Sequence, residues 1–571
     1  MQHAKATLTG LEAGAMPGLG NGRYQRMFDP RHVHPATRIE PDVLEKLAIA
    51  MIKKDKGEAI DRLEPVDENK AIPAVYTYFG QFIDHDMTLD PTPLSVDTGS
   101  VIDALEDFRT PALDLDCVYG RGKDDQPYMY NGVKLALNAR EDGAAIIVGN
   151  AGAGIGTKQD LLRIHGNAIL GDKRNDENKI VSQIQSAMIS LHNKISDNDA
   201  MLTRHGARLT ARPPHWMPDQ AAESRFRAAV TLTRWHYQYV VVHDYLHRIC
   251  DPDVVKEVLN TGGVPRLLHY AAKPFKYPYM PLEFSGAAFR FGHSMVRPSY
   301  ALNNKQGTNV KRSMVNGKSE PDEPRIATFN RDPDPTKNLN GFPGTLANDW
   351  GIDWNFFLEG MPPAEPPSHR DFKLPQPSYR IDALLTEPLA DLPEFRTAPL
   401  EIVKNLAYRN LIRGQQLALP SGESVARALN LRPLPPDVLW TAGSRCVNEG
   451  SNDQDIKDSL VATNKSRADF LADAKGPNTY GLLHNTPLWY YILREAEYYG
   501  IKTNTADEAV VLGGQHLGPV GSRIIAETII GLLWFDDTSY FHAPLGFTPE
   551  AEILGKDEKL TLSSLVRYAL T

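Results

Sequence analysis

A short segment near the start of the chain places an amide, an imidazole and two carboxylates within little more than one helical turn. Residues 80–90 read GQFIDHDMTLD. On a helix Gln81 and His85 lie at i and i+4 and share one face, and the side chains of Asp84 and Asp86 then point to either side of that face. His85 could transfer protons, Asp84 could act as a reactive or supporting carboxylate, and Asp86 could bind a divalent cation. A polar, solvent-exposed helix is the competing interpretation.

The sequence before this cluster favours burial. Residues 71–83, AIPAVYTYFGQFI, contain no charged side chain. The cluster therefore lies at the end of a segment that we expect to be buried. A buried imidazole between two carboxylates needs hydrogen-bond partners.

A second group of oxygen donors follows in the segment TPALDLDCVYG, which begins at Thr110. Its donors are the side chains of Thr110, Asp114 and Asp116 and the backbone carbonyl of Ala112. Calcium takes about six to eight oxygen ligands, so this loop falls short by one or two. Asp86 could complete the set. An Asp-rich turn without a metal is the alternative.

The segment GDKRNDENKI places Arg174 and Glu177 one turn apart. A guanidinium stays protonated and could stabilise negative charge developing on a bound peroxide, while the glutamate could attach to or support a cofactor. By itself this pair also fits a solvated turn before the helix that starts near Ile180.

Two later segments suggest an iron ligand and its partner. In AAFRFGHSMVRP, His293 lies among apolar residues three positions after Arg290, as an axial ligand beside an anionic propionate would require. In NLIRGQQLALPSG, Asn410 and Arg413 share a helix face, and an amide acceptor could fix the tautomer of an axial histidine. The alternative for His293 is a hydrogen-bonded core histidine. We expect His192 to be such a core residue.

The elements that position these residues are predicted to be mainly helices. Helical periodicity recurs at 180–196, 223–250, 399–416, 424–429, 486–499 and 522–535. The best strand signal is 144–148. Residues 149–158, GNAGAGIGTK, lack the spacing of a nucleotide-binding loop. Long connections at 298–343 and 361–377 are rich in Asn, Asp, Pro and Gly, and loops of this length around helices suit a buried cofactor.

Composition excludes several classes of protein. The chain has 571 residues, 23% of them charged, and a net charge of -9, which argues against nucleic-acid binding. No apolar run approaches the roughly 18–20 residues of a membrane span, and no signal peptide is visible, so we expect a cytoplasmic or leaderless secreted protein. The three cysteines are too scattered for a disulfide framework or zinc site.

In this order, the five segments that contain Gln81, Thr110, Arg174, His293 and Asn410 resemble the signature of the animal-type haem peroxidases, the peroxidase-cyclooxygenase superfamily, in a bacterial-looking version similar to myeloperoxidase- and lactoperoxidase-like enzymes. GGQHLGPVGSRIIAETIIGLL, at 513–533, resembles the end of that domain. The resemblance implies a mainly α-helical fold around a buried haem, with very little β structure, in one domain at 21–571 after an extension at 1–20.

The resemblance also implies roles for single residues. On the distal side His85 would transfer protons, Arg174 would stabilise charge, and Gln81 would position water or a halide. Asp84 and Glu177 match positions that form ester bonds to haem.

On the proximal side His293 would bind the iron, Asn410 would hydrogen-bond it, and Arg290 and Arg413 would contact the propionates. The implied calcium ligands are Asp86, Thr110, Ala112, Asp114 and Asp116.

Two departures from the family pattern affect the expected chemistry. Asn178 stands where a methionine forms a further haem link, so at most two bonds to haem b are expected and efficient chloride oxidation is not. Asp116 replaces a frequent serine, which should make the calcium site more anionic.

The activity implied is reduction of hydrogen peroxide through a ferryl intermediate, with oxidation of iodide, bromide, thiocyanate or phenols. One alternative is a fatty-acid dioxygenase of the cyclooxygenase or α-dioxygenase kind, which needs a tyrosine near the proximal face. Residues 349–360 offer Phe356 and Phe357 and no tyrosine. Another alternative is a haem-binding or adhesive protein without catalysis, although such a site has no physical reason to retain a costly buried charge. The oligomeric state stays open.

Overall fold

The structure is a computed structural model. It describes residues 24–52, 68–89, 107–138, 155–157, 159–209, 220–270, 278–303, 312–315, 318–321, 325–332, 334, 337–341, 346, 350–362, 374–395, 397–398, 400–440, 446–447, 477, 480–499 and 511–571.

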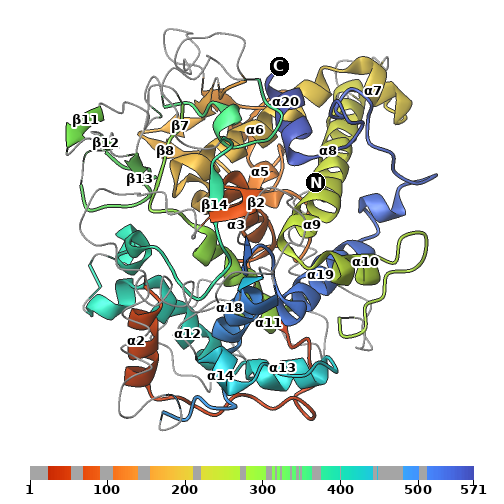
Figure 1. Ribbon diagram of the computed structural model, residues 1–571. Coiled ribbons are helices and arrows are strands. Elements are labelled where there is room, and N and C mark those ends of the chain that lie inside the picture. The colour runs from red at the N-terminus through yellow and green to blue at the C-terminus, as the bar shows by residue number, and fades with distance from the viewer. Residues whose placement is uncertain are drawn as a thin grey trace.

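Helices dominate the described part of the chain (Figure 1). The longer α-helices are α2 (Pro41–Ala50), α3 (Val75–Met87), α6 (Lys179–Ser196), α8 (Gln220–Val240), α12 (Leu406–Gln416), α18 (Leu488–Tyr499) and α19 (Pro519–Trp534). The shorter ones are α5 (Asp116–Tyr119), α7 (Asp199–Arg204), α9 (Leu246–Ile249), α10 (Pro252–Leu259), α11 (Leu282–Gly286), α13 (Gly422–Ala428), α14 (Pro436–Leu439) and α20 (Leu562–Leu570).

Tighter and wider helical turns connect these helices. The 3₁₀ helices are η2 (Pro127–Met129), η3 (Lys173–Asp176), η5 (Ala288–Met295), η6 (Trp354–Phe356), η7 (Glu387–Ala390), η8 (Pro393–Phe395), η9 (Glu401–Lys404) and η10 (Tyr540–His542). A π-helical segment, η4 (Val241–Tyr245), joins α8 to α9.

The strands of the described residues form only two-stranded pairs. The antiparallel pairs are β2 (Glu68–Pro73) with β14 (Pro377–Tyr379), β3 (Tyr130–Asn131) with β4 (Lys134–Leu135), β5 (Leu137–Asn138) with β6 (Asp160–Leu161), β7 (Arg163–Ile164) with β8 (Asn167–Ala168), β10 (Ser299–Tyr300) with β13 (Ile326–Ala327), β11 (Arg312–Val315) with β12 (Lys318–Pro321), and β15 (Cys446–Val447) with β16 (Val511–Leu512). β1 (Tyr24–Gln25) and β9 (Met280–Pro281) pair in parallel.

The structure confirms the predicted mainly helical fold and most of the predicted helices. The helix predicted at 399–416 is interrupted, because Asn405 ends η9 and caps α12 by accepting hydrogen bonds from the backbone N–H groups of Ala407 (2.8 Å) and Tyr408 (3.2 Å). The predicted strand at 144–148 lies outside the described residues, as does most of the glycine-rich loop after it.

Helix α3, which contains the first polar cluster, lies in the centre of the molecule (Figure 1). It packs against α6, η3 and η5. Phe79 meets the rings of Tyr237 and Tyr245 edge to face, at 6.1 and 5.7 Å between centroids. Gly80 permits this approach, since a Cβ there would overlap Tyr245. The burial predicted for the uncharged segment at 71–83 is therefore confirmed.

The buried apolar side chains form one contiguous cluster that extends from Met27 to Ala569. Within the described ranges, we find no helix with the length and apolarity needed to cross a bilayer.

Candidate active site

His85 is held by an amide from the next polar segment. Its side chain is almost completely buried on α3, and Nδ1 lies 2.7 Å from Oδ1 of Asn175, which follows Arg174 in η3. Burial, with a contribution from Arg174, lowers the pKa of His85 to about 3, so the ring is neutral. An amide oxygen can only accept, so Nδ1 must carry the proton and Nε2 keeps a lone pair. His85 is thus prepared to act as a base.

The orientation of Asn175 is set by a second amide. Its Nδ2 donates to Oε1 of Gln185 (3.0 Å), and Gln185 Nε2 donates to the backbone carbonyl of Cys117 (3.2 Å). Because a carbonyl can only accept, this chain leaves Asn175 Oδ1 facing His85. Sequence reasoning missed both amides; the only available signal was that Asn175 adjoins Arg174.

Gln81 and Glu177 also meet beside His85. Gln81 Nε2 donates to Glu177 Oε1, and that oxygen lies 3.8 Å from His85 Nε2. Burial, followed by the charge of Glu394, raises the pKa of Glu177 to about 8. The predicted shared face of Gln81 and His85 is therefore present, and Glu177 is protonated at neutral pH.

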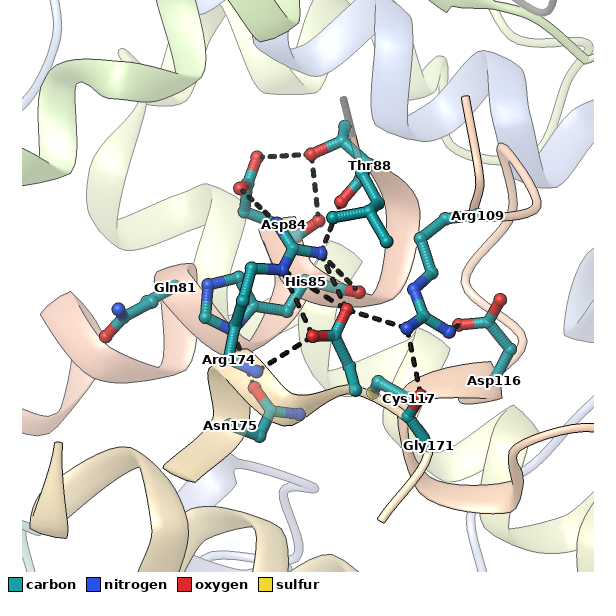
Figure 2. Close-up of polar contacts among 12 residues, drawn as sticks. Gln81, Asp84, His85, Thr88, Arg109, Asp116, Cys117, Gly171, Arg174 and Asn175 are labelled. Atoms are coloured by element: carbon teal, nitrogen blue, oxygen red, sulfur yellow. Dashed lines mark hydrogen bonds and ion pairs between the residues drawn. The ribbon is translucent and has the colours of Figure 1, made fainter. Parts of the chain in front are cut away.

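Arg174 is anchored by an acid and by the end of α3 (Figure 2). Its Nε and NH2 donate to Asp172 at 3.1 and 2.7 Å, and NH2 also donates to the carbonyls of Thr88 (2.5 Å) and His85 (3.3 Å). Its NH1 lies 4.0 Å from Oδ2 of Asp84. Arg174 therefore belongs to a buried polar network and not to a solvated turn.

Three of these side chains are only partly buried. Burial raises the pKa of Asp84 and of Glu177. Nevertheless, Asp84, Arg174 and Glu177 keep 36%, 21% and 20% of their side-chain surface exposed. Two carboxyls and a guanidinium are therefore partly desolvated and still accessible to a ligand. These residues fit a haem bound beside α3.

His293 lies in η5, which packs against α3; Thr77 Oγ1 of α3 donates to the carbonyl of Met295 in η5 at 3.5 Å. Its Nδ1 lies 2.8 Å from Asn410 Nδ2, so the predicted pairing with Asn410 is present. Burial, with Arg290 next, lowers the pKa of His293 to about 3.

The polarity of that pairing differs from the expectation. Arg290 NH1 donates to Asn410 Oδ1 (2.8 Å), and Arg290 Nε donates to the carbonyl of Ser285 (2.8 Å). A guanidinium can only donate, so it takes the amide oxygen and turns the amide nitrogen towards His293. Asn410 is therefore a donor to the ring, not the predicted acceptor. Arg413 is buried one turn further along α12, on the face predicted for it.

The three aspartates predicted to bind calcium come together. Ligand atoms of Asp86, Asp114 and Asp116 all lie within 4.8 Å of one another. Oδ1 of Asp86 and Oδ2 of Asp116 are buried and accept no hydrogen bond among the described residues. Burial, then Asp114, raises the pKa of Asp86 to about 7. Clustered carboxylates in which two buried oxygens lack a donor fit a hard divalent cation.

The loop around these aspartates turns sharply. Leu115 adopts a left-handed conformation with φ of 58°, and its N–H donates to Asp86 Oδ2 at 3.1 Å. Thr110 and Ala112 lie in the same loop, where Ala112 N–H donates to the Thr110 carbonyl at 2.7 Å. Whether Thr110 and the Ala112 carbonyl bind the same cation as the three aspartates stays a prediction.

Two further sequence interpretations can be placed. His192 Nε2 lies 2.9 Å from the Val133 carbonyl, as expected for a hydrogen-bonded core residue. Asn178 is buried and caps α6 by accepting from the Ile180 N–H at 2.9 Å. Asn178 therefore has a structural role beside Glu177.

Tyrosines from other segments pack near the phenylalanines of 349–360. Tyr300 stacks on Phe357 with 6.3 Å between ring centroids, and Tyr78 of α3 meets Tyr300 edge to face at 5.5 Å. The sequence segment has no tyrosine, but the folded neighbourhood does.

A cavity of about 200 Å³ borders Asn410 and Trp489, among mainly apolar residues of α2, α12 and α18. Neither His85 nor His293 lines this cavity, whereas Asn410, the partner of His293, does.

Residues 106–331 match the family model of the animal haem peroxidases. The match includes Arg174, Glu177, Arg290 and His293, whereas the His85 segment and Asn410 lie outside it. Among curated proteins, no sequence matches the chain.

Three solved structures are similar to this chain at low sequence identity. Peroxidase A from Dictyostelium discoideum aligns with a TM-score of 0.50 and 15% identity, over 96% of this chain and 92% of that one. A fatty acid α-dioxygenase from Oryza sativa gives 0.48 and 14%, over 100% and 87%. The α-dioxygenase from Arabidopsis thaliana gives 0.47 and 14%, over 94% and 74%.

The family match lies within a mainly helical fold that places one histidine on α3 and another on the adjoining η5. Residues 106–331 are thus similar to the animal haem peroxidases, and the fold of the chain is similar to that of peroxidase A from Dictyostelium discoideum.

Proposed function

We propose that the protein reduces hydrogen peroxide at a haem b held between α3 and η5, and oxidises small donors such as iodide, bromide, thiocyanate or phenols. The observation that carries this proposal is the neutral His85 whose Nδ1 proton is fixed by Asn175. Haem would supply the iron that binds peroxide and would accept the electrons that the donor gives up.

The distal residues supply the proton transfers. Nε2 of His85 would take a proton from one oxygen of hydrogen peroxide and return it to the other, which leaves as water, while the haem would supply the two electrons for O–O cleavage. Arg174 places a permanent positive charge beside the developing negative charge, and Asp172 fixes its orientation. Gln81 and the protonated Glu177 would order water or a halide next to Nε2.

The remaining residues would hold the cofactors. His293 is the proposed iron ligand, Arg290 and Arg413 the propionate contacts, and Asp84 and Glu177 the carboxyls that form esters. We assign calcium to Asp86, Thr110, Ala112, Asp114 and Asp116. We further propose that residues 21–571 form one peroxidase domain and 1–20 an extension.

The test compares His85→Ala with an exposed control, His32→Ala, after both are loaded with haem and calcium. Stopped-flow absorbance would follow peroxide consumption with each donor. We expect His85→Ala to retain haem and to react with peroxide about 10²–10⁴ times more slowly, and the control to match the unmodified protein. An unchanged rate in His85→Ala would overturn the proposal.

A second candidate, fatty-acid dioxygenase activity, is favoured by one observation: Tyr78 and Tyr300 pack together close to Phe357. Oxygen uptake with linoleate or arachidonate and no added peroxide, lost in Tyr300→Phe, would support this candidate. No uptake would exclude it.

A further inference from the structure

Arg109, which directly precedes the calcium loop, connects that loop to the distal segment. Its NH1 lies 3.3 Å from Asp116 Oδ1, and its NH2 lies 2.9 Å from Asp172 Oδ2 and donates to the Gly171 carbonyl at 2.9 Å. Its side chain is 12% exposed. Arg109 therefore contacts one carboxylate of the metal cluster and one carboxylate outside it.

Asp172 is shared between two arginines, Arg109 and Arg174. Besides Arg109, it accepts hydrogen bonds from Nε and NH2 of Arg174 and from the Arg174 backbone N–H at 2.9 Å. Although burial by itself would raise its pKa, Arg174 and Arg109 hold the pKa of Asp172 below its usual range. Asp172 is therefore ionised and attracts both guanidinium groups.

The contacts form one continuous chain in which acidic and basic side chains alternate. It leads from Asp116 through Arg109 and Asp172 to Arg174, whose NH2 donates to the carbonyls of Thr88 and His85 at the end of α3. Asp116 and Asp172 are only 6% and 2% exposed, so water screens these charges weakly.

A divalent cation on the aspartate cluster would change the balance at Arg109. The cation and the guanidinium compete for Asp116 and repel each other, so an occupied cluster pushes Arg109 towards Asp172. Asp172 then attracts Arg174 less strongly. When the cluster is empty, Asp116 attracts Arg109 more strongly. Asp172 then interacts less with Arg109 and more with Arg174.

We propose that Arg109 and Asp172 are positioning residues that couple cation binding at Asp86, Asp114 and Asp116 to the placement of Arg174. The distal part rests on the proposed function, in which Arg174 faces bound peroxide. The coupling is reciprocal, so changes at Asp172 must alter cation affinity although Asp172 is not a ligand.

Calcium titration calorimetry of the haem-free protein tests the metal half. In Arg109→Gln the competitor for Asp116 is gone, so calcium affinity should rise by about tenfold, a typical size for coupled sites. In Asp172→Asn, Arg109 loses its charged partner outside the cluster and holds Asp116 more tightly, so calcium affinity should fall. The matched control is Arg121→Gln, which removes a surface arginine paired with Asp125 and should change nothing.

The double variant Arg109→Gln/Asp172→Asn separates coupling from damage. Without Arg109, the change at Asp172 should no longer affect calcium affinity, so the two effects should not add. A general loss of structure would lower affinity in both single variants. Lower affinity in Arg109→Gln, or additive effects in the double variant, would overturn the proposal. Arg109→Lys, which keeps the charge, should give an intermediate affinity if Gln at this position impairs folding.

Cyanide binding to the haem-loaded protein tests the distal half, since this anion would bind next to Arg174. Calcium should change cyanide affinity in the unmodified protein and in Arg121→Gln, and should have no effect in Arg109→Gln. An equal calcium effect in all three would overturn the coupling to Arg174. The calorimetry needs no haem, so it decides the metal half independently of whether the peroxidase proposal fails.

Discussion

The two histidines of the site are each paired with an asparagine, but the two pairs have opposite polarity. Nδ1 of His85 faces the oxygen of Asn175, whereas Nδ1 of His293 faces the nitrogen of Asn410. The difference originates one contact further away. Gln185 accepts a hydrogen bond from Asn175 Nδ2, so the Asn175 oxygen faces the ring of His85. Arg290 donates to the oxygen of Asn410, so the Asn410 nitrogen faces the ring of His293. The partner behind each amide thus decides the tautomer of each imidazole.

The distal pair is therefore already in the state its proposed role needs, whereas the proximal pair must change when haem binds. His85 has its Nε2 lone pair available for proton transfer. His293 accepts at Nδ1, which places its proton on Nε2, the atom that would bind iron. Binding of haem would require the ring proton to be on Nδ1 instead of Nε2, and Asn410 to turn its oxygen to the ring. Arg290 would then be released from Asn410 and could reach a propionate.

The largest expected difference between the two regions is in haem affinity. His293→Ala should weaken haem binding by more than about 100-fold, because the iron loses its axial ligand. His85→Ala should bind haem as well as the unmodified protein. Absorbance titration of both variants with haem measures this. Equal losses in both would mean that the two histidines do not have different roles.

Replacing Asn410 should have a smaller effect on the proximal side. Asn410→Leu should weaken haem binding by about 10-fold, since nothing would hold Nδ1. Asn410→Asp can accept from both Arg290 and His293, so it should retain haem and lower the reduction potential of the iron by making the imidazole more anionic. Spectroelectrochemistry measures the potential. An unchanged potential would mean that Asn410 does not contact the ligand in the loaded protein.

Asn175 provides the corresponding test on the distal side. Asn175→Leu should slow peroxide consumption by about 10-fold with normal haem content, because Nδ1 loses its acceptor and the tautomer is no longer fixed. Asn175→Asp should raise the pKa of His85 and so reduce the rate below about pH 6.5, where the ring would then be protonated. A flat pH profile from pH 5 to 8 in Asn175→Asp would contradict the assigned contact.

The smallest expected effect is on the pH dependence of stability without haem. Burial, with Glu394 next, raises the pKa of Glu177 from 4.5 to about 8, so the folded protein binds a proton here that the unfolded chain has released. Stability should therefore fall as pH rises through this window, by at most about 5 kcal/mol for this group. Glu177→Gln should reduce that fall. Urea unfolding of both proteins at pH 5 and pH 8 measures the difference. An equal change in unfolding free energy in the two proteins would contradict a buried neutral Glu177.

Local spacing explains how much of the site could be predicted. Gln81 and His85 share a face because they lie four residues apart on a helix, and Asp86 points to the other side for the same reason. The donors that follow Thr110 are likewise close in sequence. The helix at 180–196 was predictable from its periodicity because one face is buried throughout. Such features depend only on neighbours within a few residues.

The sequence by itself therefore determined the mainly helical class, the side chains able to do chemistry, and the family they resemble. The tertiary structure decided their chemical states. It brought Asn175 to His85 across 90 positions and Asn410 to His293 across 117, and it placed Arg109 between two acids. Tautomers and buried charges depend on partners distant in sequence, because in a desolvated interior the nearest donor or acceptor replaces water and fixes the proton.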